Sequence, residues 1–141
     1  MKSPILVVDD DLAVRAMSAG ILRDAGYIVL EAAQANEAIL QLDEHPTTTL
    51  LFTDVNMPGL NGYVLADMAV TRWPHLRILY TTAMPTTYPD DGRCGSRHGE
   101  TLAKPYRAKQ LTDAVAESLA RPRPSIERWG DPLFVPLVAQ C

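Results

Sequence analysis

The sequence predicts a doubly wound α/β domain built on a mainly parallel sheet, and three observations support this fold class. Short apolar segments alternate along the chain with longer segments whose apolar residues recur at helical spacing, and parallel strands need such crossovers. The apolar segments are nearly continuous, as in strands that are buried on both faces. The 141 residues, 47% of them hydrophobic, suffice for one globular domain. We therefore expect a five-stranded sheet with helices on both faces.

Five short segments are rich in apolar or β-branched residues, and each predicts one strand of this sheet. The first four have a clear strand pattern, whereas the fifth is the shortest and weakest. In chain order, the predicted strands are Ile5–Val8, Ile28–Glu31, Leu50–Thr53, Ile78–Thr81 and Thr101–Ala103.

Four further segments place their apolar residues on one helical face. Asp11 precedes the first of them and is a candidate N-cap, and Gly26 follows it where a C-terminal glycine is common. Pro74 stops the third, because a proline disfavours helical backbone in the residue before it. In chain order, the predicted helices are Leu12–Ala25, Asn36–Glu44, Gly62–Trp73 and Ala108–Leu119.

Two segments do not fit this alternation. The segment "MPTTYPDDGRCGSRHGE" lies between the fourth and fifth strands, where a further helix, the fourth in chain order, would be expected. It has two prolines, three glycines and no apolar periodicity, which predicts that this fourth helix is irregular or shortened. Residues 121–141 form a proline-punctuated tail after a domain of residues 1–120. The apolar part of that tail, from Leu133 to Val138, either packs on the domain or docks to a partner or a second protomer.

Charge and composition exclude several classes of protein. The net charge of -4 disfavours direct binding to nucleic acid, which attracts basic surfaces. Cys94 and Cys141 have no metal-binding spacing, and the acidic start "MKSPILVVDDD" does not match a signal peptide, so we expect a cytoplasmic location. No apolar stretch has the roughly 18 residues that a membrane helix needs.

Acidic residues follow two of the predicted strands, at the edge of a parallel sheet where ligands bind. Asp9, Asp10 and Asp11 come after the first strand, and Asp54 comes after the third. Carboxylates gathered in one place repel one another unless a cation is bound, and hard oxygen ligands suit Mg²⁺. Mg²⁺ commonly bridges one or two carboxylates and a substrate phosphate, so Asp54 is a candidate nucleophile toward phosphorus.

Two further strands end on groups that contact phosphate. Thr82 follows the fourth strand and offers a hydroxyl donor, and Lys104 follows the fifth and offers an ammonium group. Such donors neutralise charge on the transferring phosphoryl oxygens. Taken singly, each has a simpler interpretation: Asp11 as a helix cap, Thr82 as a strand-end residue and Lys104 as a surface lysine. Their combination with Asp54 favours phosphoryl chemistry.

The order of acidic pair, central aspartate, threonine and Lys-Pro resembles the receiver domains of bacterial two-component response regulators. The resemblance extends over about Pro4 to Ala120 and rests on "VVDD", "FTDVNMPGLNG", "TTA" and "KPY". It implies a flavodoxin-like sheet in the order 2-1-3-4-5. It also implies a phosphorylation-dependent switch, with a histidine kinase or a histidine phosphotransfer protein as the phosphoryl donor and protein–protein interaction as its output.

The resemblance assigns roles to individual residues. Asp54 is expected to accept the phosphoryl group, Thr82 to be the switch hydroxyl and Lys104 to pair with the phosphate. The metal ligands are expected to be Asp9, Asp10, Asp54 and the backbone carbonyl of Asn56, with Mg²⁺ as the ion.

One position departs from the family pattern, because Thr101 stands where many receivers have a tyrosine or phenylalanine that rotates inward on phosphorylation. Two rival interpretations stay open. A phosphohydrolase of the haloacid-dehalogenase kind would need a second acid two residues after the nucleophile, where Asn56 stands. A degenerate receiver would act as a constitutive interaction module without phosphorylation.

Overall fold

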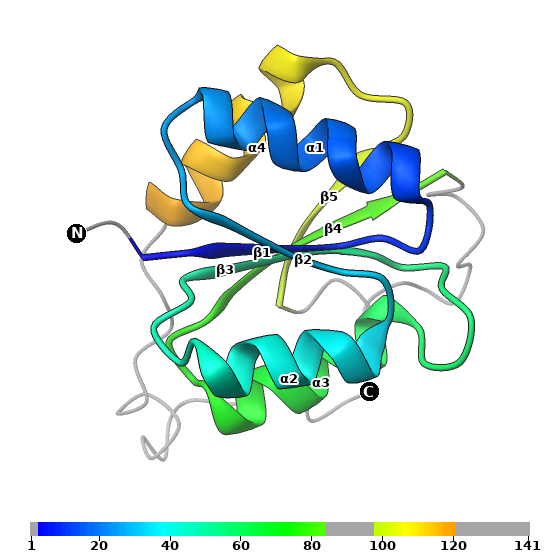
Figure 1. Cartoon of the computed structure of the whole chain (residues 1–141), viewed down its shortest axis with the longest axis vertical. Helices are drawn as coiled ribbons and strands as arrows, with labels where there is room; N and C mark the ends of the chain where they lie inside the picture. The colour runs from blue at the N-terminus through cyan, green and yellow to red at the C-terminus, as the bar shows by residue number, and fades with distance from the viewer. Residues whose placement is uncertain (1–2, 84–97, 121–141) are drawn as a thin grey trace, which may run out of the picture.

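The computed structural model describes residues 3–83 and 98–120, and within them the predicted α/β fold is confirmed. Five parallel strands form one sheet in the order β2-β1-β3-β4-β5, as the resemblance implied. The helices α1 and α4 cover one face, and α2 and α3 cover the other (Figure 1). Residues 84–97, which make up most of the segment predicted to be irregular, lie outside the described residues, and so does the tail, residues 121–141. Among the described residues, no helix is both long and apolar enough to span a membrane.

The observed elements follow the predicted ones closely, with two informative differences. The second strand lies one residue later than predicted, because Ile28 is 47% exposed and the buried positions are Val29 and Ala32. The fifth strand begins earlier, at Gly99, because its backbone pairs with β4 from Ile78 onward. The elements are β1 Ile5–Val8, α1 Leu12–Asp24, β2 Val29–Ala32, α2 Ala35–Glu44, β3 Leu50–Asp54, α3 Gly62–Arg72, β4 Arg77–Thr82, β5 Gly99–Ala103 and α4 Ala108–Ala120.

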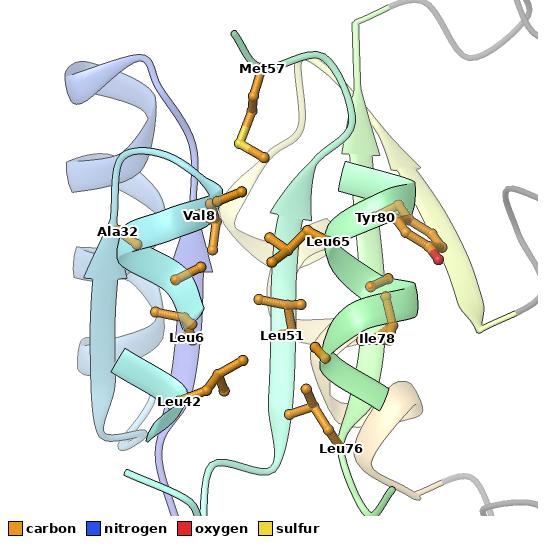
Figure 2. Close-up of a cluster of buried hydrophobic side chains, with 14 of the residues drawn as sticks. Leu6, Val8, Ala32, Leu42, Leu51, Met57, Leu65, Leu76, Ile78 and Tyr80 are labelled. Atoms are coloured by element: carbon orange, nitrogen blue, oxygen red, sulfur yellow. The ribbon is translucent and has the colours of Figure 1, made fainter. Parts of the chain in front are cut away.

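Two hydrophobic clusters hold the layers together, one on each face of the sheet. Successive side chains of a strand point to opposite faces, so Leu6 belongs to one cluster and Ile5 to the other. Figure 2 shows the cluster between the sheet and the α2–α3 layer. The largest aliphatic residues in that cluster are Leu6, Leu42, Leu51, Leu65, Leu76 and Ile78. The opposite cluster includes Ile5, Leu22, Phe52, Leu79, Tyr106 and Leu111.

Helix ends fix the loops at the carboxyl edge of the sheet. The Asp11 side chain accepts hydrogen bonds from the backbone N–H groups of Ala13 and Val14, so the predicted N-cap is confirmed. Asn61 caps α3 in the same way by accepting from Val64 N–H at 2.9 Å. Both helices therefore begin beside the carboxyl ends of β1 and β3.

Gly62 brings the start of α3 against the end of β3. Its N–H donates to the Val55 carbonyl at 2.9 Å, and a Cβ at this position would lie 2.3 Å from the Asp54 carbonyl oxygen. Only glycine permits this approach of backbone to backbone. The loop after β3 therefore depends on glycine at position 62.

We expect Gly62→Ala to destabilise the fold by about 1–3 kcal/mol, because the added methyl group must displace the backbone at the end of β3. Gly20→Ala is the matched control: a Cβ at this α1 position meets nothing within 4 Å, and alanine favours a helix interior by about 0.5–1 kcal/mol. Urea unfolding of the two variants should therefore shift in opposite directions. A Gly62→Ala variant as stable as the parent chain would contradict the close approach.

Candidate functional site

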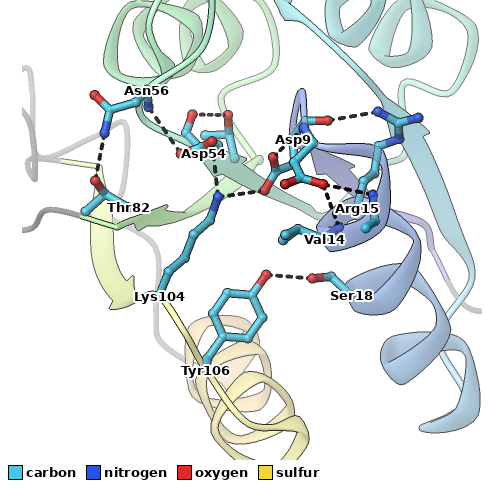
Figure 3. Close-up of polar contacts among 12 residues, drawn as sticks. Asp9, Val14, Arg15, Ser18, Asp54, Asn56, Thr82, Lys104 and Tyr106 are labelled. Atoms are coloured by element: carbon cyan, nitrogen blue, oxygen red, sulfur yellow. Dashed lines mark hydrogen bonds and ion pairs between the residues drawn. The ribbon is translucent and has the colours of Figure 1, made fainter.

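The sheet brings residues from β1, β3, β4 and β5 to one edge. Val8 and Thr53 are opposite each other in neighbouring strands, so the next residues, Asp9 and Asp54, lie side by side. Lys104, directly after β5, places its Nζ 2.9 Å from Asp9 Oδ2 and 3.2 Å from Asp54 Oδ2 (Figure 3). The strand order thus assembles residues that are up to 95 positions apart in the sequence.

The two bridged carboxylates are buried and held by backbone donors. Asp9 is 2% exposed and Asp54 is 4% exposed, whereas Asp10 is exposed. Asp9 Oδ1 accepts from Asp11 N–H at 2.9 Å, and Asp54 Oδ1 accepts from Asn56 N–H at 3.2 Å. Each carboxylate therefore has one oxygen on a backbone N–H group and the other on Lys104.

Burial and like charge perturb the acid–base properties of this group. Burial raises the pKa of Asp54; the Lys104 charge and the Asn56 N–H oppose this increase, and the Asp9 charge adds to it. For Lys104, burial acts to lower the pKa, but the contacts with Asp9 and Asp54 outweigh it and the pKa is raised. Lys104 therefore stays cationic at neutral pH, beside Asp54, whose raised pKa means that it loses its proton at a higher pH than an ordinary aspartate.

Three carboxylates at this edge could hold a metal ion. Asp9, Asp10 and Asp54 each offer an oxygen, and these oxygens lie within 4.8 Å of one another. An all-oxygen set with two buried members and an exposed third fits a hard divalent cation such as Mg²⁺, which also keeps several waters. The fourth predicted ligand, the Asn56 carbonyl, belongs to the loop that follows Asp54.

Thr82 is buried at the end of β4 and is tied to the loop after β3. Its Oγ1 accepts a hydrogen bond from Asn56 Nδ2 at 3.0 Å, and its carbonyl accepts from Lys104 N–H at 2.9 Å. Asn56 therefore contacts both Asp54, through its backbone, and Thr82, through its side chain. The structure thus brings Asp9, Asp10, Asp54, Asn56, Thr82 and Lys104 together.

Two interactions beside the site were not expected from the sequence. The guanidinium of Arg15 donates to the Asp9 carbonyl at 2.9 Å and pairs with Glu31, so it supports the turn that presents Asp9. The hydroxyls of Tyr106 and Ser18 lie 2.6 Å apart beneath Lys104. Tyr106 stands within the quoted "KPY", but nothing in the sequence indicated that its partner is a serine 88 positions away.

Sequence comparison relates the chain to proteins of known class. The family described as "Response regulator receiver domain" matches residues 5–116. Response regulator protein FleR of Pseudomonas aeruginosa is 32% identical over 142 residues, which cover 99% of this chain and 29% of FleR. Response regulator receiver protein CpdR of Brucella abortus is 30% identical over 115 residues, which cover 82% of this chain and 95% of CpdR. The chain therefore spans a minor part of FleR and almost all of CpdR.

Solved structures share the fold. Chemotaxis protein CheY4 of Vibrio cholerae matches with a TM-score of 0.77 and 27% identity, over 84% of this chain and all of CheY4. The receiver domain of the hybrid histidine kinase CckA matches with a TM-score of 0.70 and 33% identity, over 83% of this chain and 99% of that domain.

We expect Asp54→Asn to stabilise the fold at neutral pH in buffer without divalent cations. Because the pKa of Asp54 is higher in the folded than in the unfolded chain, its ionisation weakens folding, and asparagine resembles the protonated form. The advantage should be absent below the ordinary pKa of 3.8 and should grow as the pH rises through the folded-state pKa.

Urea unfolding at several pH values measures this difference. Asp113→Asn, which removes an exposed carboxylate of α4, controls for the loss of one negative charge. A less stable Asp54→Asn variant at neutral pH would show that attraction to Lys104 outweighs the burial of Asp54.

Proposed function

Because the chain belongs to the response regulator receiver domain family, we propose that it accepts a phosphoryl group on Asp54 and signals through the resulting change in shape. The single observation that supports this assignment best is the bridge from Lys104 to the two buried carboxylates of Asp9 and Asp54. A cation placed between two acids at a sheet edge is suited to a group that adds further negative charge.

Asp54 acts as the nucleophile in this proposal. One carboxylate oxygen attacks phosphorus of a phosphohistidine, a P–O bond forms as the P–N bond breaks, and the leaving imidazole takes a proton. Asn56 N–H holds Asp54 Oδ1 at 3.2 Å, so the carboxylate keeps one orientation during the attack. Its burial also restricts the water that would hydrolyse the acyl phosphate.

Lys104 and Thr82 receive the new charge. A phosphoryl group adds about -1.5 to -2 charges and several acceptor oxygens. Lys104 exchanges part of its contact with the two carboxylates for a phosphoryl oxygen. Thr82 turns its hydroxyl toward another oxygen and leaves Asn56 Nδ2, whose contact of 3.0 Å belongs to the resting state. The end of β4 and the loop after β3 therefore respond together.

Asp9, Asp10 and Asp54 would hold Mg²⁺, and the Asn56 carbonyl would complete the protein ligands. When bound, the ion supplies positive charge to the transferring phosphoryl oxygens. Asp9 serves this role in a fixed orientation, since Asp11 N–H and Lys104 occupy both of its oxygens in the resting state. Asp10, which is exposed, supplies the ligand nearest to solvent.

The proposed donor is a histidine kinase or a histidine phosphotransfer protein in the cytoplasm, and the proposed output is binding to another protein. Among the similar proteins, a receiver makes up almost all of CpdR, and another is a domain of the hybrid histidine kinase CckA. A hydrolase is disfavoured because Asn56 uses its amide to hold Thr82 and offers no carboxyl as a general acid. A constitutive module is disfavoured because the candidate acceptor Asp54 is in direct contact with Lys104, which also contacts Asp9.

Incubation with acetyl phosphate and Mg²⁺ should add the mass of one phosphoryl group to the intact protein. The adduct should be absent from Asp54→Asn and from samples that contain a chelator, because the nucleophile and the ion are both required. An adduct that persists in Asp54→Asn would place the acceptor elsewhere. Continuous release of phosphate without a lasting adduct would indicate a hydrolase.

Lys104→Met should slow the acquisition of this phosphoryl group by about 10²-fold, since removing one donor to developing oxyanion charge typically has an effect of this size. Lys109→Met is the matched control, because Lys109 is exposed on α4 and pairs only with Asp113 among the described residues. The initial rate of mass increase measures both variants. Equal rates for Lys104→Met and the parent chain would contradict the role given to Lys104.

A further inference from the structure

A pair of hydroxyls lies buried in the apolar layer between α1 and the sheet. Ser18 occupies the inner face of α1 and is 1% exposed, next to Ala19 and near Leu22, both fully buried. Tyr106, 8% exposed, reaches it from the segment that joins β5 to α4, and the two oxygens lie 2.6 Å apart. Alanine and phenylalanine would fill the same space without polar atoms. The two hydroxyls therefore satisfy each other at a position where packing alone does not require them.

This pair is joined to the site through a short piece of backbone. Only Pro105 separates Tyr106 from Lys104, and proline fixes one of its own backbone dihedrals. The Tyr106 ring also packs edge-on against Phe52, with ring centroids 5.8 Å apart. Phe52 lies two residues before Asp54 on β3. Tyr106 thus touches the strand that carries Asp54. It also follows Lys104, which pairs with Asp54, and Figure 3 shows Tyr106, Lys104 and Asp54 in this order from the segment after β5 to the sheet edge.

We propose that the Ser18–Tyr106 hydrogen bond couples phosphorylation of Asp54 to helix α1, an inference that rests on the proposed function. In the resting state, Lys104 is drawn to Asp9 and Asp54. A phosphoryl group extends outward from Asp54, so Lys104 and the adjoining Pro105 follow it. Tyr106 is displaced with them, and its bond to Ser18 is weaker in the phosphorylated form.

The position of the pair gives it a specific consequence. Thr101, at the place where the family pattern has an aromatic switch residue, is exposed and carries no aromatic ring. Tyr106 already occupies a buried position, and its partner lies in the middle of α1, on the face opposite α2 and α3. Ser18 and Tyr106 are therefore positioning residues that pass a change at Lys104 to the layer formed by α1 and α4.

The test compares Ser18→Ala, Tyr106→Phe and the double variant for Mg²⁺-dependent binding of beryllofluoride, which mimics a phosphoryl group on a carboxylate. Because a bond that favours the resting form opposes the ligand-bound form, each single variant should bind about fivefold more tightly than the parent chain. The double variant should show no further gain, since either change removes the same bond. Titration calorimetry gives the affinities.

A second readout and a control separate coupling from mere stability. In the parent chain, beryllofluoride should shift the backbone amide resonance of Ser18, and Tyr106→Phe should reduce that shift. Thr48→Val removes another buried hydroxyl, bonded to the His45 carbonyl at 2.7 Å and remote from the site, and it should lower stability without changing affinity.

Unchanged or weaker binding by the single variants would overturn the inference, because Lys104 would then follow the phosphoryl group by side-chain rotation alone. Absence of Mg²⁺-dependent binding by the parent chain, or binding that survives in Asp54→Asn, would instead overturn the proposed function and the inference with it. The two failures are therefore distinguishable.

Discussion

The repulsion between Asp9 and Asp54, and its relief by Lys104, is the constraint on which the site depends. Both carboxylates are almost completely buried, and they lie side by side because β1 and β3 are neighbours in the sheet. Two such charges need a cation, and Lys104, which follows β5 on the far side of β4, contacts both carboxylates. Strand order, helix caps and the position of Lys104 directly after β5 bring these three groups together. The result is a site in which one lysine is shared by two buried acids.

Much of this arrangement could be predicted from the sequence. Apolar segments and helical periodicity gave the element order, since parallel strands buried on both faces leave a simple pattern. Polar residues directly after strands gave the site, because the carboxyl ends of parallel strands share one edge. The strand order itself came from the resemblance to receiver domains, because nothing in the strand patterns determines which strands are neighbours. The roles of the individual residues remain predictions.

Other features required coordinates because they depend on pairing between distant residues. The early start of β5 at Gly99 follows from hydrogen bonding to β4, which outweighs the poor strand propensity of Gly99 and Glu100. A serine at position 18 is unremarkable in a helical pattern, and a tyrosine after Lys-Pro could serve packing alone. Their contact becomes visible only when α1 lies against the segment after β5. Sequence patterns report the period of each element and not which polar atoms meet between elements.

Asn56 links Asp54, the proposed acceptor, to Thr82 through one residue. Its backbone N–H fixes Asp54 Oδ1, and its side-chain amide holds the Thr82 hydroxyl. The first bond can persist after phosphorylation, since it uses the oxygen that Lys104 does not contact in the resting state. In the proposed switch the second is lost because Thr82 Oγ1 moves away from the amide; the hydroxyl accepts from Asn56 and would donate to a phosphoryl oxygen, so the two bonds use different parts of the group. In the proposed switch, the loop after β3 therefore stays anchored at Asp54 while its contact with β4 is exchanged, and Tyr106 carries the change at Lys104 toward α1.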